Sequence, residues 1–117
     1  MRDDRENVIV SKTIDFSLLV VKYCEILDMN RKFVISKQLL RAATSIGANV
    51  FEAQNAESRA DFIHKMKIAA KEASETQYWL IICERSENYC FDIKLRTDLE
   101  VIIKILSKII SSSKQGY

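Results

Sequence analysis

The sequence predicts an all-α protein, an antiparallel up-down four-helix bundle that forms a single domain over residues 1–117. The chain has no proline and only two glycines, whereas folds rich in strands and loops need more of both residues for their turns. Four apolar-patterned segments of roughly twenty residues, joined by short connections, account for the whole chain. A length of 117 residues suits one hydrophobic core and is too short for two domains.

Polar segments and spacing place the first two helices. We expect the first helix at about residues 11–28, because the polar run 28–32 follows it. The second helix is expected at about residues 34–56, where small and apolar residues recur at helical spacing. Its alanine-rich inner face predicts close packing against a neighbouring helix.

Capping residues place the other two helices. The third is expected at about residues 58–86, because Ser58 and Asp61 have the spacing of a capping box. Asp92 is a favourable N-cap for a fourth helix at about residues 92–112. We expect the polar residues that follow to fray.

More apolar surface is present than one bundle core can use. On the first helix, Ile14, Leu18 and Val21 share one face, and a second apolar set lies on the opposite face. Large exposed apolar surfaces usually mark an interface, so we predict a homo-oligomer. The predicted interface residues are Phe16, Val20, Tyr23, Leu27, Val101 and Ile105. The alternative is a groove for a helix of another protein.

Polar side chains follow one flank of the second and third helices. If these helices pack antiparallel through a turn near residue 57, Arg41 lies opposite Glu72 and Glu75. An arginine beside carboxylates predicts a partly buried, bidentate ion pair. The predicted structural polar network comprises Arg41, Ser45, Asn49, Glu52, Glu72, Glu75 and Trp79.

The residues of catalytic and metal sites are missing from the sequence pattern. Di-iron bundles use Glu-x-x-His motifs on two helices, and this chain has one histidine, His64. The three cysteines form no C-x-x-C pair and suggest buried free thiols in a reducing compartment. No glycine-rich phosphate loop is present. We therefore predict no enzyme activity, no catalytic residue, no bound metal and no cofactor.

The ends and the apolar runs of the chain bear on its location. The N-terminal residues are charged and lack the apolar region of a signal peptide. No apolar run reaches the ~18 residues that a transmembrane helix requires. We expect a cytoplasmic protein that does not engage a membrane.

Charge leaves nucleic-acid binding open as a hypothesis. The net charge is only +2, whereas dedicated nucleic-acid binders are usually more basic. In a ring of several copies, a modest basic surface would repeat and its affinity would grow by avidity. The candidate contact residues are Lys65, Lys67, Lys71, Lys104 and Lys108. The alternative is an ordinary solvated helix surface.

Residues 38–80 carry a resemblance to a known family. The matching positions are Gln38-Leu39-Leu40-Arg41-Ala42-Ala43, Ser45-Ile46, Ala48-Asn49, Glu52-Ala53, Phe62, Lys71-Glu72-Ala73, Glu75 and Tyr78-Trp79-Leu80. With these residues the chain resembles the bacterial four-helix-bundle proteins encoded in intervening sequences of 23S ribosomal RNA genes. The resemblance implies an up-down bundle and a ring-like homopentamer. Related bundles serve as accessory proteins of reverse transcriptases in diversity-generating retroelements, where they bind nucleic acid and the enzyme.

These observations favour a non-enzymatic oligomeric scaffold or binding protein. Its first expected partner is itself, as a homopentamer. Two further hypotheses stay open: association with RNA or DNA, either alone or beside a reverse transcriptase, and a protein-only adaptor that docks a partner through its surplus apolar surface.

Overall fold

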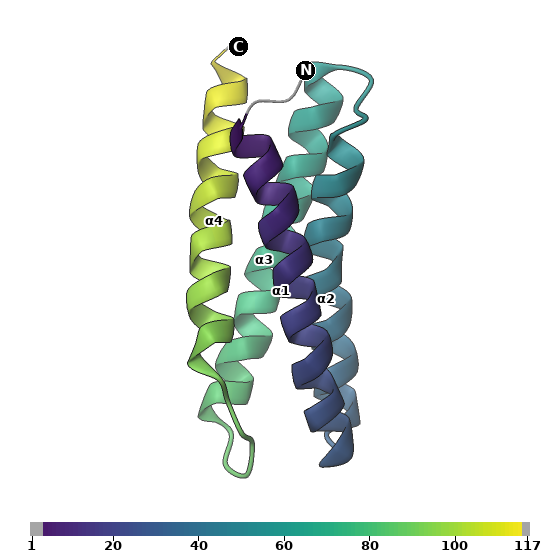
Figure 1. Cartoon of the computed structure of the whole chain (residues 1–117), viewed down its shortest axis with the longest axis vertical. Helices are drawn as coiled ribbons and strands as arrows, with labels where there is room; N and C mark the ends of the chain where they lie inside the picture. The colour runs from purple at the N-terminus through teal and green to yellow at the C-terminus, as the bar shows by residue number, and fades with distance from the viewer. Residues whose placement is uncertain (1–3, 116–117) are drawn as a thin grey trace.

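The structure, a computed structural model, describes residues 4–115, with side chains described from residue 8 onward. Over this range it is all-α: α1 (Asp4–Met29), α2 (Phe33–Ala53), α3 (Arg59–Arg85) and α4 (Ile93–Lys114), without a strand. The four helices lie side by side along one long axis, with the connections at its two ends (Figure 1). The chain measures 48 × 20 × 19 Å along its principal axes. The predicted all-α class with four helices is confirmed.

Contacts between the helices form a closed circuit. Each helix packs against the next one along the chain, and α1 also packs against α4. Within the described residues, the diagonal pairs α1–α3 and α2–α4 have no close backbone contact. This pattern is compatible with the up-down order that the sequence predicts.

The described helix boundaries differ from the predicted ones at three ends. Helix α1 begins at Asp4, seven residues before the predicted start, and buried Ile9 anchors its early turns in the core. Helix α2 ends at Ala53 rather than near residue 56, where tight i→i+3 bonds such as Ala56 N–H to Ala53 C=O replace the α-helical pattern. Helix α4 continues to Lys114, two residues beyond the predicted end, and residues 116–117 of the tail that we expected to fray lie outside the described residues.

Both predicted N-caps are confirmed. The Ser58 hydroxyl accepts a hydrogen bond from the Asp61 amide at 3.0 Å, and the Asp61 carboxylate accepts one from the Glu57 amide at 3.1 Å. The Asp92 carboxylate accepts a bond from the Lys94 amide at 3.0 Å. These contacts satisfy backbone donors that the first helical turn leaves free. The predicted bounds of the third helix are therefore correct to within one residue.

The apolar faces of α1 are arranged opposite to the prediction. Four of the predicted interface residues are buried in the chain's own core, and this set comprises Phe16, Val20, Tyr23 and Leu27. In their place Ile14, Leu18 and Val21 face solvent. The physical reason is length: the buried series continues from Ile9 through five turns, whereas the series 14–18–21 continues into charged Glu25 and Asp28.

Gly47 of α2 lies against Thr13 and Ser17 of α1. A methyl group at this position would lie 3.4 Å from the Thr13 Cβ and 3.5 Å from the Ser17 Oγ. Thr13 is buried and satisfies its hydroxyl by donating to the Ile9 carbonyl at 2.8 Å. The small residue thus brings the two helices together and leaves their outer seam shallow.

Candidate interaction surfaces

An open apolar groove runs along the outer seam of α1 and α2, and we call it the α1–α2 groove. It has a volume of about 470 Å³. Its lining residues are Ile14, Ser17, Leu18, Thr44, Gly47, Ala48, Phe51 and Glu52. Leu18 and Phe51 are each 59% exposed and Ile14 is 47% exposed. Large side chains at the rims and small ones between them form a concave apolar surface.

The groove follows directly from two helical repeats. On α1, Ile14 and Leu18 are four residues apart and share a face. On α2, Thr44, Ala48 and Phe51 do the same. The candidate interface on α1 therefore lies on the face of the helix opposite to the predicted interface residues.

The two predicted interface residues on α4 differ in exposure. Val101 is 43% exposed, whereas Ile105 is half-buried and packs against the core. Val101 lines a pocket of about 160 Å³ at the seam of α1 and α4. Ile105 therefore packs mostly against its own chain.

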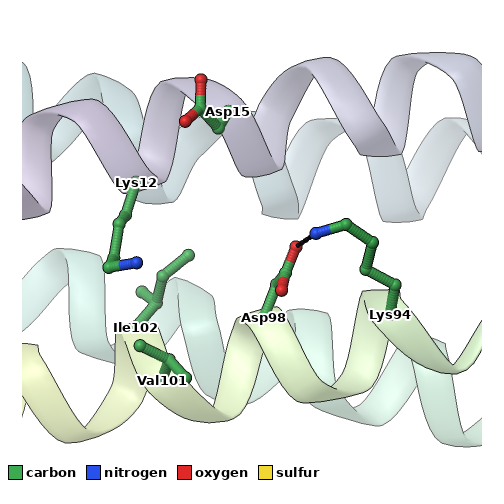
Figure 2. A pocket seen from close by; sticks show the side chains of 6 residues that line it. All are labelled: Lys12, Asp15, Lys94, Asp98, Val101 and Ile102. Carbon is green, nitrogen blue, oxygen red and sulfur yellow. Dashed lines mark hydrogen bonds and ion pairs between the residues drawn. The ribbon is translucent and has the colours of Figure 1, made fainter.

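Figure 2 shows this second pocket, which is dominated by charge. Lys12 reaches from α1 toward Ile102 of α4, while the Asp15 carboxylate points away from α4 (Figure 2). The Lys94 ammonium lies 2.7 Å from the Asp98 carboxylate, an i,i+4 pair on α4 that raises the pKa of Lys94. Because these charges pair along one helix, the pocket offers a polar wall beside Val101 rather than a continuation of the apolar surface.

Arg41 connects α2 to two carboxylates of α3. Its guanidinium lies 3.4 Å from a Glu72 oxygen and also pairs with Glu75. The Trp79 indole donates a hydrogen bond to Glu75 at 3.1 Å. The ion pair that the sequence predicted is present, although half of the Arg41 side chain is exposed.

The other members of the predicted polar network are not part of this cluster. The Ser45 hydroxyl donates to the Arg41 carbonyl, and the Asn49 amide donates to the Ser45 carbonyl, both within α2. Glu52 pairs with Lys65 of α3 at 3.7 Å. The structure thus divides the predicted network into one four-residue cluster, one separate ion pair and two side chains bonded to their own helix.

The candidate lysines lie on different flanks of the molecule. Lys65 lies toward α2, where it pairs with Glu52. Lys67 lies toward α4, where the nearby Lys114 lowers the pKa of Lys67. Lys71, Lys104 and Lys108 are exposed. Helical spacing within α3 could have separated Lys65 from Lys67, whereas the nearness of Lys67 and Lys114 depends on the packing of α3 on α4.

Two of the three cysteines are sealed in the core. Cys24 and Cys83 are buried, and burial raises the pKa of both thiols, that of Cys24 to about 11. Burial also raises the pKa of Tyr23, whose hydroxyl donates to the Cys90 carbonyl at 2.7 Å. Cys90 itself is exposed. Among residues 4–115, no group of three or more His, Cys, Asp or Glu side chains is placed to hold a metal ion.

None of the helices described in the structure is long and apolar enough to cross a membrane.

Four packed helices with polar contacts at their seams and one open apolar groove define an all-α bundle protein. Residues 5–112 match the family of 23S rRNA-intervening sequence proteins, and the chain belongs to this family. The chain is similar to the crystal structure of a protein of unknown function of the S23 ribosomal protein family from Bacteroides thetaiotaomicron VPI-5482. The two are 44% identical with a TM-score of 0.86, and the match covers 92% of this chain and 98% of the other. A comparison with curated proteins found no match.

Proposed function

We propose that this protein is a non-enzymatic cytoplasmic scaffold, an antiparallel up-down bundle whose copies associate through the α1–α2 groove into a homopentameric ring. The observation that carries the proposal is the exposure of Ile14, Leu18 and Phe51 around one concave seam. Contact with a second copy would remove these side chains from water, which stabilises association by about 25 cal/mol per Å² of apolar surface. The number of five rests on the family resemblance.

The groove suits a helix of another copy. Thr44, Gly47 and Ala48 keep its floor shallow, so a helix could approach the α2 backbone closely. Glu52 stands at one end and Val21, 37% exposed, lies one turn beyond Leu18. An apolar centre with a charged residue at its margin is the usual composition of a specific protein interface.

The test is the mass of the particle in solution, measured by size-exclusion chromatography with light scattering. We expect the wild type to have five times the 13.5 kDa mass of the chain. Leu18→Glu should weaken association about 100-fold, or about 2.8 kcal/mol, because it places a carboxylate in the apolar contact.

Val34→Glu is the matched control, because Val34 is 74% exposed and lies outside the groove. It should leave the particle intact. A wild type that is monomeric at micromolar concentration would refute self-assembly and would favour the protein-only adaptor, with the groove open to a different partner. Dissociation of both variants alike would also refute the assignment to the groove.

A further inference from the structure

A ring of five copies needs a second contact surface besides the α1–α2 groove. A contact between two identical surfaces closes a dimer, whereas a ring forms when two different surfaces of the chain meet repeatedly. The directions from one copy to its two neighbours in such a ring differ by about 108°, the interior angle of a regular pentagon. When copies stand side by side, the second surface therefore lies on a side of the bundle next to the groove, rather than on the opposite side.

The side formed by α1 and α4 meets this condition. Helix α1 packs against both α2 and α4, so the α1–α4 side adjoins the groove, whereas the α3–α4 side lies opposite to it. The exposed apolar side chain on the α1–α4 side is that of Val101, which lines the pocket at this seam.

Val101 and the groove also lie at the same height along the bundle. The pocket that Val101 lines is bounded on α1 by Lys12 and Asp15 (Figure 2). Ile14, which lies between these two residues in the sequence, lines the groove together with Leu18. Two copies that stand side by side would therefore bring Val101 of one copy against the groove of the next.

The exposed aromatic residue on α3 lies at a different height. Tyr78 is 56% exposed, and its ring packs against that of Trp79 with 5.2 Å between the centroids. Trp79 bonds to Glu75, which pairs with Arg41. Arg41 precedes Thr44, the first residue of α2 that lines the groove, by almost one turn. A contact between copies that stand side by side would therefore leave Tyr78 beyond the end of the groove.

Helix α4 presents a ridge that suits the concave groove. Thr97, Val101 and Lys104 are spaced by four and three residues, so they share one face of the helix, and all three are exposed. The floor of the groove contains Gly47 and Ala48, whose small side chains leave room for the short side chain of Val101. The apolar residue of the ridge thus matches the part of the groove where a helix can approach most closely.

Charge complementarity supports the same register. Helices α2 and α4 run in the same direction (Figure 1), and Lys104 lies about 4.5 Å beyond Val101 while Glu52 lies about 6 Å beyond Ala48. Among the ion pairs within residues 8–115, none involves Lys104. The Glu52 side chain is 62% exposed and lies 3.7 Å from Lys65, so it can accept a second cation. With Val101 over Ala48, Lys104 of one copy reaches Glu52 of the next.

We propose that α4 of each copy docks in the α1–α2 groove of the next copy, with Val101 on the floor of the groove and Lys104 beside Glu52. This inference rests on the proposed ring and names its second surface. Burial of Val101, Ile14 and Leu18 would supply the apolar part of the contact, and the ion pair at its margin would fix the register.

The first experiment measures the mass of the Val101→Glu variant by light scattering over a dilution series. We expect association to weaken about 100-fold, as for Leu18→Glu, because the carboxylate would lie on the apolar floor of the groove. Ile93→Glu is the matched control, since Ile93 is a 51% exposed residue of the same helix that lies two turns before Val101. This control should assemble like the wild type.

The result separates this inference from the proposed function. If Leu18→Glu dissociates the particle while Val101→Glu leaves it intact, the groove is the interface and α4 is not its partner. Equal dissociation of Val101→Glu and Ile93→Glu would also overturn the docking of α4. A monomeric wild type would refute the ring itself, and with it both proposals.

The second experiment exchanges the two charges and does not depend on the Val101 variant. Lys104→Glu and Glu52→Lys should each weaken association about 10-fold, because each places like charges together at the margin of the contact. The double variant Lys104→Glu/Glu52→Lys should regain most of the loss. Helices α2 and α4 are diagonal and have no close backbone contact within the described residues, so a recovery would come from contact between copies. A double variant that associates no better than the single variants would refute the register.

Discussion

Arg41 joins α2 to α3 through two ion pairs. Its guanidinium pairs with both Glu72 and Glu75, and Glu75 also accepts a hydrogen bond from the Trp79 indole. Glu72 is the least exposed of the two carboxylates, at 21%, so it depends most on the guanidinium. The cluster therefore orients an aromatic side chain as well as joining two helices.

Arg41→Ala should lower the free energy of unfolding by about 0.5–1 kcal/mol in urea denaturation. The effect should be modest because both partners retain contact with water, which screens exposed ion pairs. Arg41→Lys should recover part of the loss, since it restores the charge but not the two-pronged geometry. An Arg41→Ala variant as stable as the wild type would show that the cluster does not stabilise the fold.

Sequence reasoning found this ion pair because an antiparallel helical hairpin fixes which residues face each other. Counting outward from the turn near residue 57 places Arg41 beside Glu72 and Glu75. The same reasoning overestimated Ser45 and Asn49. Their side chains are short and polar, and each bonds a carbonyl one turn earlier in α2 instead of reaching α3.

At the scale of elements, helix α1 shows where periodicity alone is insufficient. Two apolar stripes compete for the core, and a short window does not distinguish them. Extending the pattern toward Ile9 in one direction and Glu25 in the other identifies the buried stripe. The predicted start of α1 at residue 11 is too late for the same reason. The apolar pattern extends back to Ile9, which lies before that predicted start.

The end of α1 is a Schellman motif built around an unfavourable residue. The Lys32 amide donates to the Leu27 carbonyl at 2.8 Å, and the Arg31 amide donates to the Asp28 carbonyl at 2.9 Å. This geometry requires a left-handed backbone at Arg31, whose φ is 63°. Glycine is the usual residue at that position because it lacks a Cβ.

Arg31→Gly should raise the free energy of unfolding by about 0.5–1 kcal/mol, since it relieves the left-handed strain of a residue with a Cβ. Lys37→Gly, in the exposed interior of α2, should instead lower it by about 1 kcal/mol. Urea denaturation of the two variants gives the comparison. A decrease for Arg31→Gly would mean that the arginine side chain makes contacts worth more than the strain.

At the scale of the whole molecule, the candidate surfaces are separated by the core. The apolar groove belongs to α1 and α2, whereas the exposed lysines Lys67 and Lys114 belong to α3 and α4. Copies that meet through the groove would therefore leave Lys67 and Lys114 accessible on the side formed by the other two helices.

Buried titratable side chains toward one end of the bundle should make the stability of the whole chain sensitive to alkaline pH. Tyr23, Cys24 and Cys83 are buried together there, and burial raises the pKa of all three groups. The folded state therefore keeps these protons at a pH at which the unfolded chain releases them. When the unfolded state binds fewer protons, the free energy of unfolding falls as pH rises.

We expect the melting temperature to be constant below the ordinary thiol pKa of 9.0 and to fall as pH rises from there toward 11, the folded-state pKa of Cys24. Cys24→Ala removes one of the linked protons, so its melting temperature should fall less steeply between pH 9 and 10. Cys90→Ala is the matched control, because the Cys90 thiol is exposed, and it should change the slope less than Cys24→Ala does. Identical slopes in the wild type and both variants would show that Cys24 does not cause the fall in melting temperature. The fall at alkaline pH would then come from another group, and Tyr23→Phe, which removes a buried hydroxyl, would be the next variant to measure.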